Sequence, residues 1–391
     1  MIKKTVHNIV KSTARLVSYC LDECTRREDV REKKRYLQEN GFPLNESCPE
    51  EQEYIHFWKQ FSPKIDPYCF RFYSHFMGKT NHIIPDNVGH KVLEYYLNPI
   101  RFRDFYNDKC IYNQLFMSNS YTPKMIFCRI DGGVLLDEKY RKAQADGKSI
   151  SYNSSAEEIA DYIRGFDSVI LKPSIDSKGG QGIEKFIRQG NVFVNTVNTK
   201  KLSGFLLKSY GNNFVVQESI QQHPFLAQFN PTSVNTLRVC TYRSVVDEEV
   251  IVFACALRMG TKGSFTDNTH SGGVITKVNL ETGKIGNCVY GKYRKRYSSW
   301  NDIDFEKFNG YVPNWSIVLD FAKDVASKVL HMRLLSLDIS LRQNGDPILI
   351  EINVNGFSFG LPMCLNQPVF GERFDEVIDY CKDKLHKEQH D

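Results

Sequence analysis

The segment 334–354 brings two acidic residues, Asp338 and Glu351, into a pattern that predicts a β-hairpin. Apolar and polar residues alternate on both sides of Asn344-Gly345, which favours a two-residue type I′ turn. With that loop, Asp338 lies directly opposite Glu351. Side chains alternate faces along a strand, so we expect one polar and one core face. The polar face should carry Ser336, Asp338, Ser340, Leu349, Glu351 and Asn353, and the core face Leu335, Leu337, Ile339, Leu341, Ile348, Ile350, Ile352 and Val354.

Two like charges that face each other destabilise a hairpin unless something offsets their repulsion. One interpretation is a divalent cation held by Asp338, Glu351 and Asn353, because such hard oxygen ligands suit Mg²⁺ beside substrate phosphates. The other is a solvated polar face that tolerates the repulsion. Because of the repulsion, we expect Glu351→Gln to leave the metal-free protein as stable as before or slightly more stable.

A lysine and a glycine-rich loop follow the predicted strand 168–172. Lys172 ends this strand, where a buried ammonium needs an anionic partner. The loop 177–182 contains three glycines that let backbone N–H groups close on a phosphate. The alternative is a flexible hairpin tip with a lysine that reaches solvent. The two common nucleotide-binding fingerprints, GxxxxGK[ST] and GxGxxG, are absent.

Three further segments contain side chains that could bind a ligand: a pair of arginines, the polar end of a strand and a polar loop. Arg238 and Arg258 flank a predicted hairpin at the end far from its turn, which indicates an anion between them or two separate surface salt bridges. The strand 214–220 ends in polar groups that could hydrogen-bond an adenine, or is an ordinary strand end. The loop 266–273 could order over a substrate with His270 as a base, although a loop histidine is more often simply exposed.

Length and composition limit the class of protein. The chain has 391 residues, which is too long for one compact core, and its 41% hydrophobic content is that of a globular protein. A net charge of +5 suits an anionic substrate without requiring nucleic acid. The eleven scattered cysteines contain no CxxC pair, so we expect reduced thiols in a cytoplasm. We expect no secretory signal and no membrane span.

The order of the predicted elements indicates an α+β protein. Residues 1–104 look mostly helical, with an exposed charged helix at 22–40. Strands and helices then mix over 105–211, and strands dominate 212–391. We therefore expect three domains with these boundaries.

These segments, in this order, resemble the ATP-grasp superfamily, and more narrowly its branch associated with sugar transfer and surface-polysaccharide biosynthesis. The resemblance covers roughly residues 85 to 380. It is carried by Asn107-Asp108-Lys109, Leu171-Lys172-Pro173-Ser174, Lys178 to Gly182, Val216 to Ile220, Val234 to Val239, Asp267-Asn268 with Gly272-Gly273, and Asp338 followed by Ile350 to Asn353.

The resemblance implies an ATP-grasp fold, in which two α+β subdomains clasp ATP. A lid subdomain would occupy 105–211 and a metal-binding subdomain 212–391. The superfamily usually begins with an α/β domain, whereas residues 1–104 look helical here. The second-substrate site therefore does not follow from the usual superfamily plan.

The resemblance also assigns roles to individual residues. Lys109 and Lys172 would contact ATP phosphates, with Lys172 also serving catalysis. Arg258 would steady the transferring phosphoryl group, and Arg238 would face the acceptor or the same phosphates. The ATP-binding set is completed by Ser174, Lys178, Gly179, Gly180, Gly182, Gln217, Glu218, Ser219 and Ile220, of which the last four receive adenine. The substrate-binding set is Asn235, Arg238, Asp267, Asn268, His270 and Gly272. Two Mg²⁺ ions, or Mn²⁺ as an alternative, would be held by Asp338, Glu351 and Asn353.

The activity implied by the resemblance is that of an ATP-dependent carboxylate–amine ligase. It would form an amide through an acyl phosphate, from a small carboxylate and an amine such as an amino acid or a sugar derivative. It would serve surface-polysaccharide or secondary-metabolite biosynthesis, with or without association with a polysaccharide-assembly machinery. Two alternatives stay open: an ATP-grasp phosphotransferase that acts on a sugar hydroxyl, and a nucleotide-binding scaffold.

Overall fold

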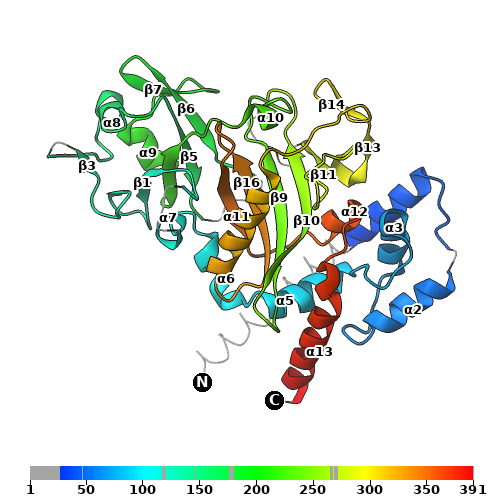
Figure 1. Ribbon diagram of the computed structural model, residues 1–391. Helices are drawn as coiled ribbons and strands as arrows, with labels where there is room; N and C mark the ends of the chain where they lie inside the picture. The colour runs from blue at the N-terminus through cyan, green and yellow to red at the C-terminus, as the bar shows by residue number, and fades with distance from the viewer. Residues whose placement is uncertain are drawn as a thin grey trace. The chain divides into compact units, whose positions relative to one another are not determined.

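The apolar runs between residues 236 and 353 form a seven-stranded antiparallel sheet, in the order β13-β12-β11-β10-β9-β16-β17 (Figure 1). Its strands are β9 (Thr236–Arg243), β10 (Val250–Met259), β11 (Val274–Lys277), β12 (Val289–Tyr290), β13 (Arg296–Tyr297), β16 (Leu334–Leu341) and β17 (Pro347–Asn353). The computed structural model describes residues 27–45, 47–116, 120–145, 147–175, 180–264, 267 and 272–390.

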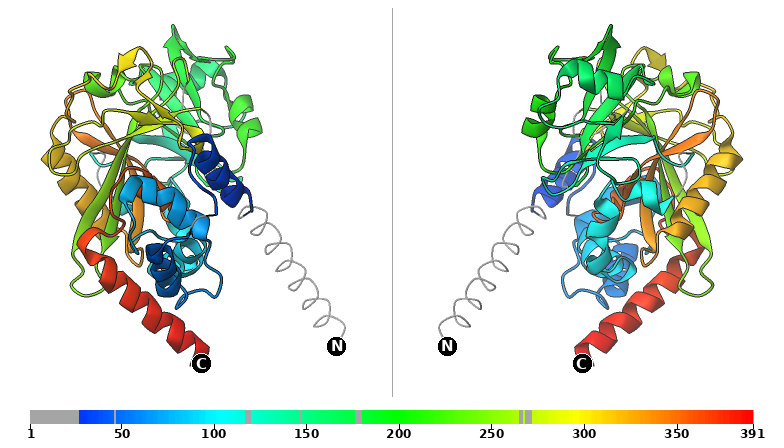
Figure 2. Two further views of the ribbon diagram at one scale, coloured as in Figure 1. Left: turned by 90° about the vertical axis from the view of Figure 1, so that its right-hand side faces the viewer. Right: turned by 90° about the vertical axis from the view of Figure 1, so that its left-hand side faces the viewer.

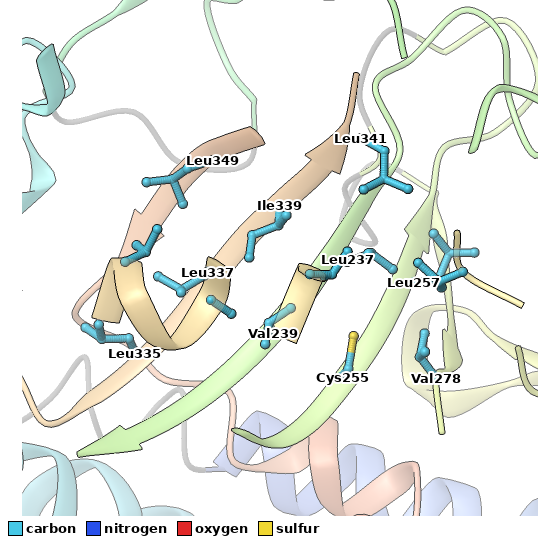
Figure 3. Packing of buried hydrophobic residues seen from close by; sticks show 14 of the residues in the cluster. Leu237, Val239, Cys255, Leu257, Val278, Leu335, Leu337, Ile339, Leu341 and Leu349 are labelled. Carbon is cyan, nitrogen blue, oxygen red and sulfur yellow. The ribbon is translucent and has the colours of Figure 1, made fainter. Parts of the chain in front are cut away.

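Helix α11 (Trp315–Lys328) covers one face of this sheet (Figures 1 and 2). Its buried positions recur at helical spacing, so they form one apolar stripe that packs on the strands. The sheet supplies alternate residues of each strand, as Figure 3 shows. This core cluster includes Leu237, Val239, Cys255, Leu257, Val278, Leu335, Leu337, Ile339, Leu341 and Leu349.

The hairpin of β16 and β17 has the predicted register at the acidic pair, where Asp338 lies opposite Glu351. The predicted two-residue turn is wrong. The backbone N–H of Arg342 donates to the carbonyl of Asp346 at 2.8 Å, which closes a three-residue loop. Of the loop residues, Gly345 takes a positive φ of 90° and Asn344 does not, so the turn is not of type I′.

A β-bulge between Asp338 and Ile339 shifts the register by one residue and compensates for the longer loop. Beyond the bulge, Ile339 pairs with Leu349. Leu349 therefore belongs to the core cluster and not to the polar face where the sequence pattern put it. Ile350, which we expected in the core, is only half-buried, because it is the extra residue of the bulge.

A six-stranded antiparallel sheet lies earlier in the chain, in the order β2-β1-β8-β5-β6-β7. Helices α8 (Ala156–Tyr162) and α9 (Gly204–Tyr210) accompany it, and α8 begins with the predicted capping box of Ser155 and Glu158. Buried Phe127, Phe186, Phe193 and Phe214 build its core. The strands are β1 (Met125–Arg129), β2 (Leu135–Asp137), β5 (Ser168–Pro173), β6 (Glu184–Gln189), β7 (Val192–Asn195) and β8 (Phe214–Glu218).

Short elements connect and flank the two sheets. Helices α6 and α7 precede the first strand, and a 3-10 turn lies between β12 and β13. These elements are α6 (Ile100–Asn107), α7 (Tyr112–Leu115), α10 (Pro224–Ala227), β3 (Gln144–Ala145), β4 (Lys148–Ser149), η3 (Lys292–Arg294), β14 (Ser299–Trp300) and β15 (Ile303–Asp304).

The chain divides into two compact units. One is Leu97–Phe357, with both sheets, and the other is built from described residues within 27–96 and 358–390. The second unit is helical, with 27–39, α2 (Pro49–Trp58), α3 (Pro67–Met77), α4 (Asp86–Val88), η1 (Gly89–Leu93), α5 (Glu94–Leu97), α12 (Gly360–Cys364), η4 (Gly371–Arg373) and α13 (Phe374–His390).

The predicted α+β class with a helical N-terminal region is confirmed for the described residues, since helices precede the first strand, β1. The predicted boundaries at 104 and 211 stay a prediction. Within the described part of the chain, no helix has the length and apolar character needed to cross a membrane. The nine cysteines described are all free thiols.

Candidate active site

The face of the seven-stranded sheet opposite the core cluster carries a row of charged residues. Glu351, Asp338 and Arg238 are direct neighbours across β17, β16 and β9. Arg258 lies two residues beyond Ala256, the partner of Arg238 on β10. Paired residues share a face, and the core residues alternate with them along each strand. The row therefore projects away from α11.

Asp338 joins the two arginines. The Nε and Nη2 of Arg238 donate to Asp338 Oδ1 and Oδ2 at 2.8 and 2.7 Å, which is a two-pronged pair. The Nη1 of Arg258 donates to Asp338 Oδ2 at 2.8 Å. The sequence predicted an anion between these arginines, and the carboxylate of Asp338 is that anion.

Asp267 continues this network. Its Oδ1 lies 3.2 Å from Arg258 Nη2, and its Oδ2 accepts a hydrogen bond from the backbone N–H of Thr236 at 3.1 Å and another from the Thr236 hydroxyl. Asp267 and Asp338 thus hold different nitrogens of Arg258, Nη2 and Nη1. The sequence analysis placed Asp267 among the substrate-binding residues; that role stays a prediction.

Lys109, in the turn between α6 and α7, reaches the other end of the row. Its Nζ lies 2.9 Å from Glu351 Oε1. Its backbone N–H donates to the carbonyl of Ser174 at 2.9 Å, which ties the turn to the segment after β5. Lys172, near the end of β5, is buried. The charges of Lys109 and Glu351 act on Lys172, so both predicted phosphate-binding lysines lie near Glu351.

The charges of this site shift the pKa values of its members. Burial raises the pKa of Asp338, but the charges and hydrogen bonds of Arg238 and Arg258 outweigh burial and lower it to about 2. Burial, helped by the charge of Lys109, lowers the pKa of Lys172 to about 8. Burial raises the pKa of Asp267 despite the charge of Arg258. Asp338 is thus held ionised, whereas Lys172 is close to losing its proton at neutral pH.

The repulsion between Asp338 and Glu351, which suggested a divalent cation, is offset here by side chains. Arg238 and Arg258 neutralise Asp338, and Lys109 neutralises Glu351. Among the described residues, no group of three or more His, Cys, Asp or Glu side chains could hold a metal ion. The charge pattern alone therefore does not require a metal.

The donor set is nevertheless of the kind that fits Mg²⁺. It consists of two carboxylates and the amide of Asn353, whose Nδ2 donates to the carbonyl of Ser336 at 3.0 Å and so leaves Oδ1 as the remaining ligand atom. Asp338 accepts three hydrogen bonds out of about four lone-pair sites. Glu351 is one third exposed, so it is open to a ligand.

The predicted adenine-binding segment 217–220 lies at the end of β8. Glu218 accepts from the backbone N–H of Lys124 and from Arg342 Nη2, each at 3.0 Å, and the backbone N–H of Ser219 donates to Ser168. The bond from Arg342 links the six-stranded sheet to the end of β16. The assignment of Gln217, Glu218, Ser219 and Ile220 to adenine stays a prediction.

The described glycines of the predicted phosphate loop, Gly180 and Gly182, both take a positive φ, near 77° and 75°. A Cβ at Gly182 would also meet the ring of Pro173 at 2.9 Å, so this turn requires glycine. Ser174, at the start of the loop, is buried. Lys178 and Gly179 lie outside the described residues.

The remaining predicted substrate residues are spread more widely. Asn235 is fully buried, and its Nδ2 donates to the carbonyls of Leu226 and Asn230 at 2.8 and 2.9 Å. Gly272 takes a positive φ of 93°. Asn268 and His270 lie outside the described residues. The substrate roles of these four residues stay predictions.

Sequence reasoning missed two residues that support the site. Thr236 binds Asp267, and it lies two residues before Arg238, so strand periodicity could have placed both on one face. The Tyr112 hydroxyl accepts from the backbone N–H of Ile352 at 2.9 Å, beside Glu351. No local pattern marks Tyr112, because this contact joins segments 240 residues apart.

Comparisons with solved structures find remote similarities. PsnB, described as an ATP-grasp ligase complexed with a minimal precursor, is 12% identical with a TM-score of 0.36 over 73% of this chain and 64% of its own. D-alanyl-alanine synthetase A from Vibrio cholerae O1 biovar eltor str. N16961 is 12% identical with a TM-score of 0.34, over 71% and 64%. D-alanine–D-alanine ligase from Bacillus anthracis is 8% identical with a TM-score of 0.37, over 73% and 69%.

The chain spans just under two thirds of the length of the first two of these proteins. Similarities this remote carry no argument about ligands or activity. A search of curated proteins found no match. The family comparison is stronger, since a model described as sugar-transfer associated ATP-grasp matches residues 93–378, well over half of the sequence. This chain therefore belongs to the sugar-transfer associated ATP-grasp family.

Proposed function

We propose that the protein is an ATP-dependent carboxylate–amine ligase that forms an amide through an acyl phosphate. One observation carries the proposal. Four cationic side chains, Arg238, Arg258, Lys109 and Lys172, gather around two opposed carboxylates on one sheet face of an ATP-grasp family member. This arrangement suits a polyphosphate whose terminal group is transferred, because such catalysis is mainly positioning and charge stabilisation.

We propose a role for each of these residues, as the family resemblance implies it. Lys109 and Lys172 bind ATP phosphates, and the glycine loop that includes Gly180 and Gly182 closes on them. Arg258 steadies the transferring phosphoryl group, and Arg238 binds the acceptor carboxylate beside it. Asp338 and Asp267 fix the planes of the two guanidinium groups, so little reorganisation is needed when the substrates bind.

The reaction has two balanced steps. A carboxylate oxygen of the acceptor attacks the terminal phosphorus of ATP, the bond to the bridging oxygen breaks, and ADP leaves with that electron pair. The amine nitrogen then attacks the acyl carbon, the phosphate leaves, and the nitrogen loses a proton. Neither step needs a nucleophilic side chain, which agrees with the lack of a Ser-His-Asp type arrangement among the described residues of the predicted site.

Asp338, Glu351 and Asn353 would hold Mg²⁺, with Mn²⁺ as the alternative. When bound, the ion neutralises phosphate charge and orients the terminal phosphate. We place the reaction in a cytoplasm, in surface-polysaccharide or secondary-metabolite biosynthesis. The sugar-transfer description of the family supports the first of these settings.

Hydroxylamine trapping tests the ligase. An acyl phosphate reacts with hydroxylamine and a sugar phosphate ester does not, so sugar acids and amino acids are incubated with ATP, Mg²⁺ and hydroxylamine. We expect ADP and a hydroxamate in equal amounts. Lys172→Met should abolish both, whereas Lys200→Met, which removes an exposed lysine from the loop after β7, should not.

Two other outcomes would replace the proposal. A stable phosphoester with no hydroxamate, found by mass spectrometry, would identify the phosphotransferase that acts on a sugar hydroxyl. ATP binding without turnover of any carboxylate or sugar hydroxyl would instead identify a nucleotide-binding scaffold.

A further inference from the structure

The two opposed carboxylates of the candidate site are held by their cations in different ways. Asp338 is almost fully buried, and its oxygens accept three hydrogen bonds from Arg238 and Arg258. Glu351 is one third exposed, and its Oε1 lies 2.9 Å from Lys109 Nζ. A buried ion pair with several hydrogen bonds is costly to break, whereas a partly exposed pair is worth little. The contact between Lys109 and Glu351 is therefore the one that can exchange when a ligand binds.

The backbone around Lys109 is fixed, so its side chain can move without the fold. The backbone N–H of Lys109 donates to the carbonyl of Ser174 at 2.9 Å, and the carboxylate of Asp108 accepts from the backbone N–H of Cys110 at 2.9 Å. A lysine has a flexible four-carbon stem, which lets Nζ leave one anion for another while the backbone stays in place. Ser174 follows Lys172 by two residues, so the turn of Lys109 is tied to the segment of the other phosphate-binding lysine of the proposed function.

Lys172 adds a second ammonium group close to the same carboxylate. Lys172 is buried, and burial lowers its pKa to about 8; the positive charge of Lys109 lowers this pKa further, while the negative charge of Glu351 raises it. Both lysines therefore depend on Glu351 for negative charge in the empty site. A polyphosphate would supply that charge to both and would release Glu351 from this role.

The charge balance of the empty site disfavours a free divalent cation. Four cationic side chains face three carboxylates, so the site is positive by one charge. These are Lys109, Lys172, Arg238 and Arg258 against Asp267, Asp338 and Glu351. Within the described part of the chain, no group of three or more His, Cys, Asp or Glu side chains could hold a metal ion. Phosphate oxygens would supply both the missing negative charge and further ligands.

We infer that Lys109 takes the place of the metal in the empty site: it neutralises Glu351, keeps free divalent cations out, and releases Glu351 only when a nucleotide phosphate binds its ammonium group. The site thus accepts a divalent cation together with a nucleotide and does not take up the cation beforehand. Lys109 thereby determines the specificity for a metal–nucleotide complex. The inference rests on the ATP and metal sites of the proposed function and is independent of the amide-forming step.

Titration with Mn²⁺ alone tests this inference, because the paramagnetic resonance signal of free Mn²⁺ broadens when the ion binds. Lys109→Met removes the ammonium group and keeps an apolar stem, and Lys109→Arg retains the charge. The matched control, Lys201→Met, removes a lysine from an exposed contact with Glu157 at 3.9 Å. The double variant Lys109→Met/Glu351→Gln shows whether any additional Mn²⁺ binds at Glu351. Each protein is titrated with and without a non-hydrolysable ATP analogue.

We expect the wild type to bind Mn²⁺ roughly tenfold or more tightly with the ATP analogue than without it, because the phosphates reverse the charge of the site. Without the analogue, Lys109→Met should bind Mn²⁺ roughly tenfold or more tightly than the wild type, because it lacks a positive charge beside the metal ligands. Its affinity for the analogue should fall, because a phosphate loses its cation. Lys109→Arg and Lys201→Met should bind Mn²⁺ alone as the wild type does, and the double variant should lose the gain.

The two opposite shifts in Lys109→Met distinguish exchange from a purely structural role. A lysine that only held the fold together would, once removed, weaken the binding of both Mn²⁺ and the analogue. Unchanged or weaker binding of Mn²⁺ alone by Lys109→Met would overturn the inference. So would a gain that persists in the double variant, since the additional ion would then bind away from Glu351.

The failure of this inference is separate from that of the ligase. If the wild type binds Mn²⁺ equally well with and without the analogue, the exchange is refuted, while hydroxamate formation still supports the ligase. If the opposite shifts occur but no carboxylate gives a hydroxamate, the ligase is refuted and the exchange is supported. A wild type that binds neither the analogue nor Mn²⁺ under any of these conditions would overturn both.

Discussion

Replacing each of the two opposed carboxylates by its amide should have very different effects on stability. Asp338→Asn removes a charge that is almost fully buried and is held by two guanidinium groups. Glu351→Gln removes a charge that is one third exposed and is held by Lys109 alone. Both variants should lose turnover if both residues hold the metal, so turnover does not distinguish them. Stability does.

For Asp338→Asn we expect a loss of about 3–5 kcal/mol in the free energy of unfolding, because two mostly buried arginines lose the anion between them. The pKa of Asp338 gives an independent estimate. Its fall from 3.8 to about 2 corresponds to roughly 2 kcal/mol at 1.36 kcal/mol per pKa unit. Since the folded-state pKa is depressed, this stabilisation is complete above pH 4 and is lost as the pH falls through 2.

For Glu351→Gln we expect a loss below about 1 kcal/mol, as for an ion pair open to solvent. This prediction differs from the sequence-based expectation of equal or greater stability. Arg238 and Arg258 already neutralise Asp338, so removal of Glu351 relieves little repulsion and costs the contact with Lys109.

Urea unfolding and hydrogen exchange measure the difference. The chain has two compact units, so exchange of the β9 and β16 amides is needed to report on the one that holds the site. Asp338→Asn should lower protection in these strands, and its stability should depend less on pH below pH 4 than that of the wild type, because the amide does not titrate. Equal destabilisation by both variants, or none by Asp338→Asn, would show that the arginine pair does not depend on this carboxylate.

Three further predictions follow from the same contacts. Lys172 is protonated below a pKa of about 8, so ATP affinity should fall as the pH rises through 8. Calorimetry in two buffers should show that a proton is taken up when ATP binds near this pH. An ATP affinity that is the same from pH 7 to pH 9 would contradict this prediction. Asp267→Asn should loosen Arg258 and lower kcat at least tenfold with the KM for ATP unchanged, and an unchanged kcat would exclude the positioning role. Gly204→Ala puts a Cβ about 2.4 Å from the carbonyl of Ser151, so it should destabilise the region of the six-stranded sheet by roughly 1–3 kcal/mol. Hydrogen exchange of the α9 amides measures this loss. Protection of α9 equal to that of the wild type would argue against this packing.

The sequence predicted the acidic pair correctly through two deviations that cancel. The Asn344-Gly345 signal implied a two-residue loop, but the loop has three residues. The bulge beyond Asp338 shifts the register back, so the polar row matches the prediction and Leu349 does not. Bulges depend on packing against neighbouring strands, and the backbone N–H of Leu349 donates to the carbonyl of Tyr121, far away in sequence. Local alternation contains no information about that contact.

The partners of the charged residues were harder to predict than the residues themselves. The sequence indicated that an anion lies near Arg238 and Arg258. It also indicated that some other group offsets the repulsion between the two opposed carboxylates. Strand order answers both questions at once, because β16 lies next to β9 and puts Asp338 beside Arg238. That adjacency joins residues 100 positions apart, and no periodicity within one segment specifies it.

The resulting charge balance explains why this site should bind an anion before it does chemistry. Four cations, Arg238, Arg258, Lys109 and Lys172, face three carboxylates, so the cluster is positive by one charge. Two arginines carry about ten N–H donors, of which Asp338 takes three and Asp267 pairs with another. The carboxylates therefore fix the guanidinium planes without using most of their donors. Such a site is oriented before the ligand arrives, and an arriving phosphate meets N–H groups that are already aimed.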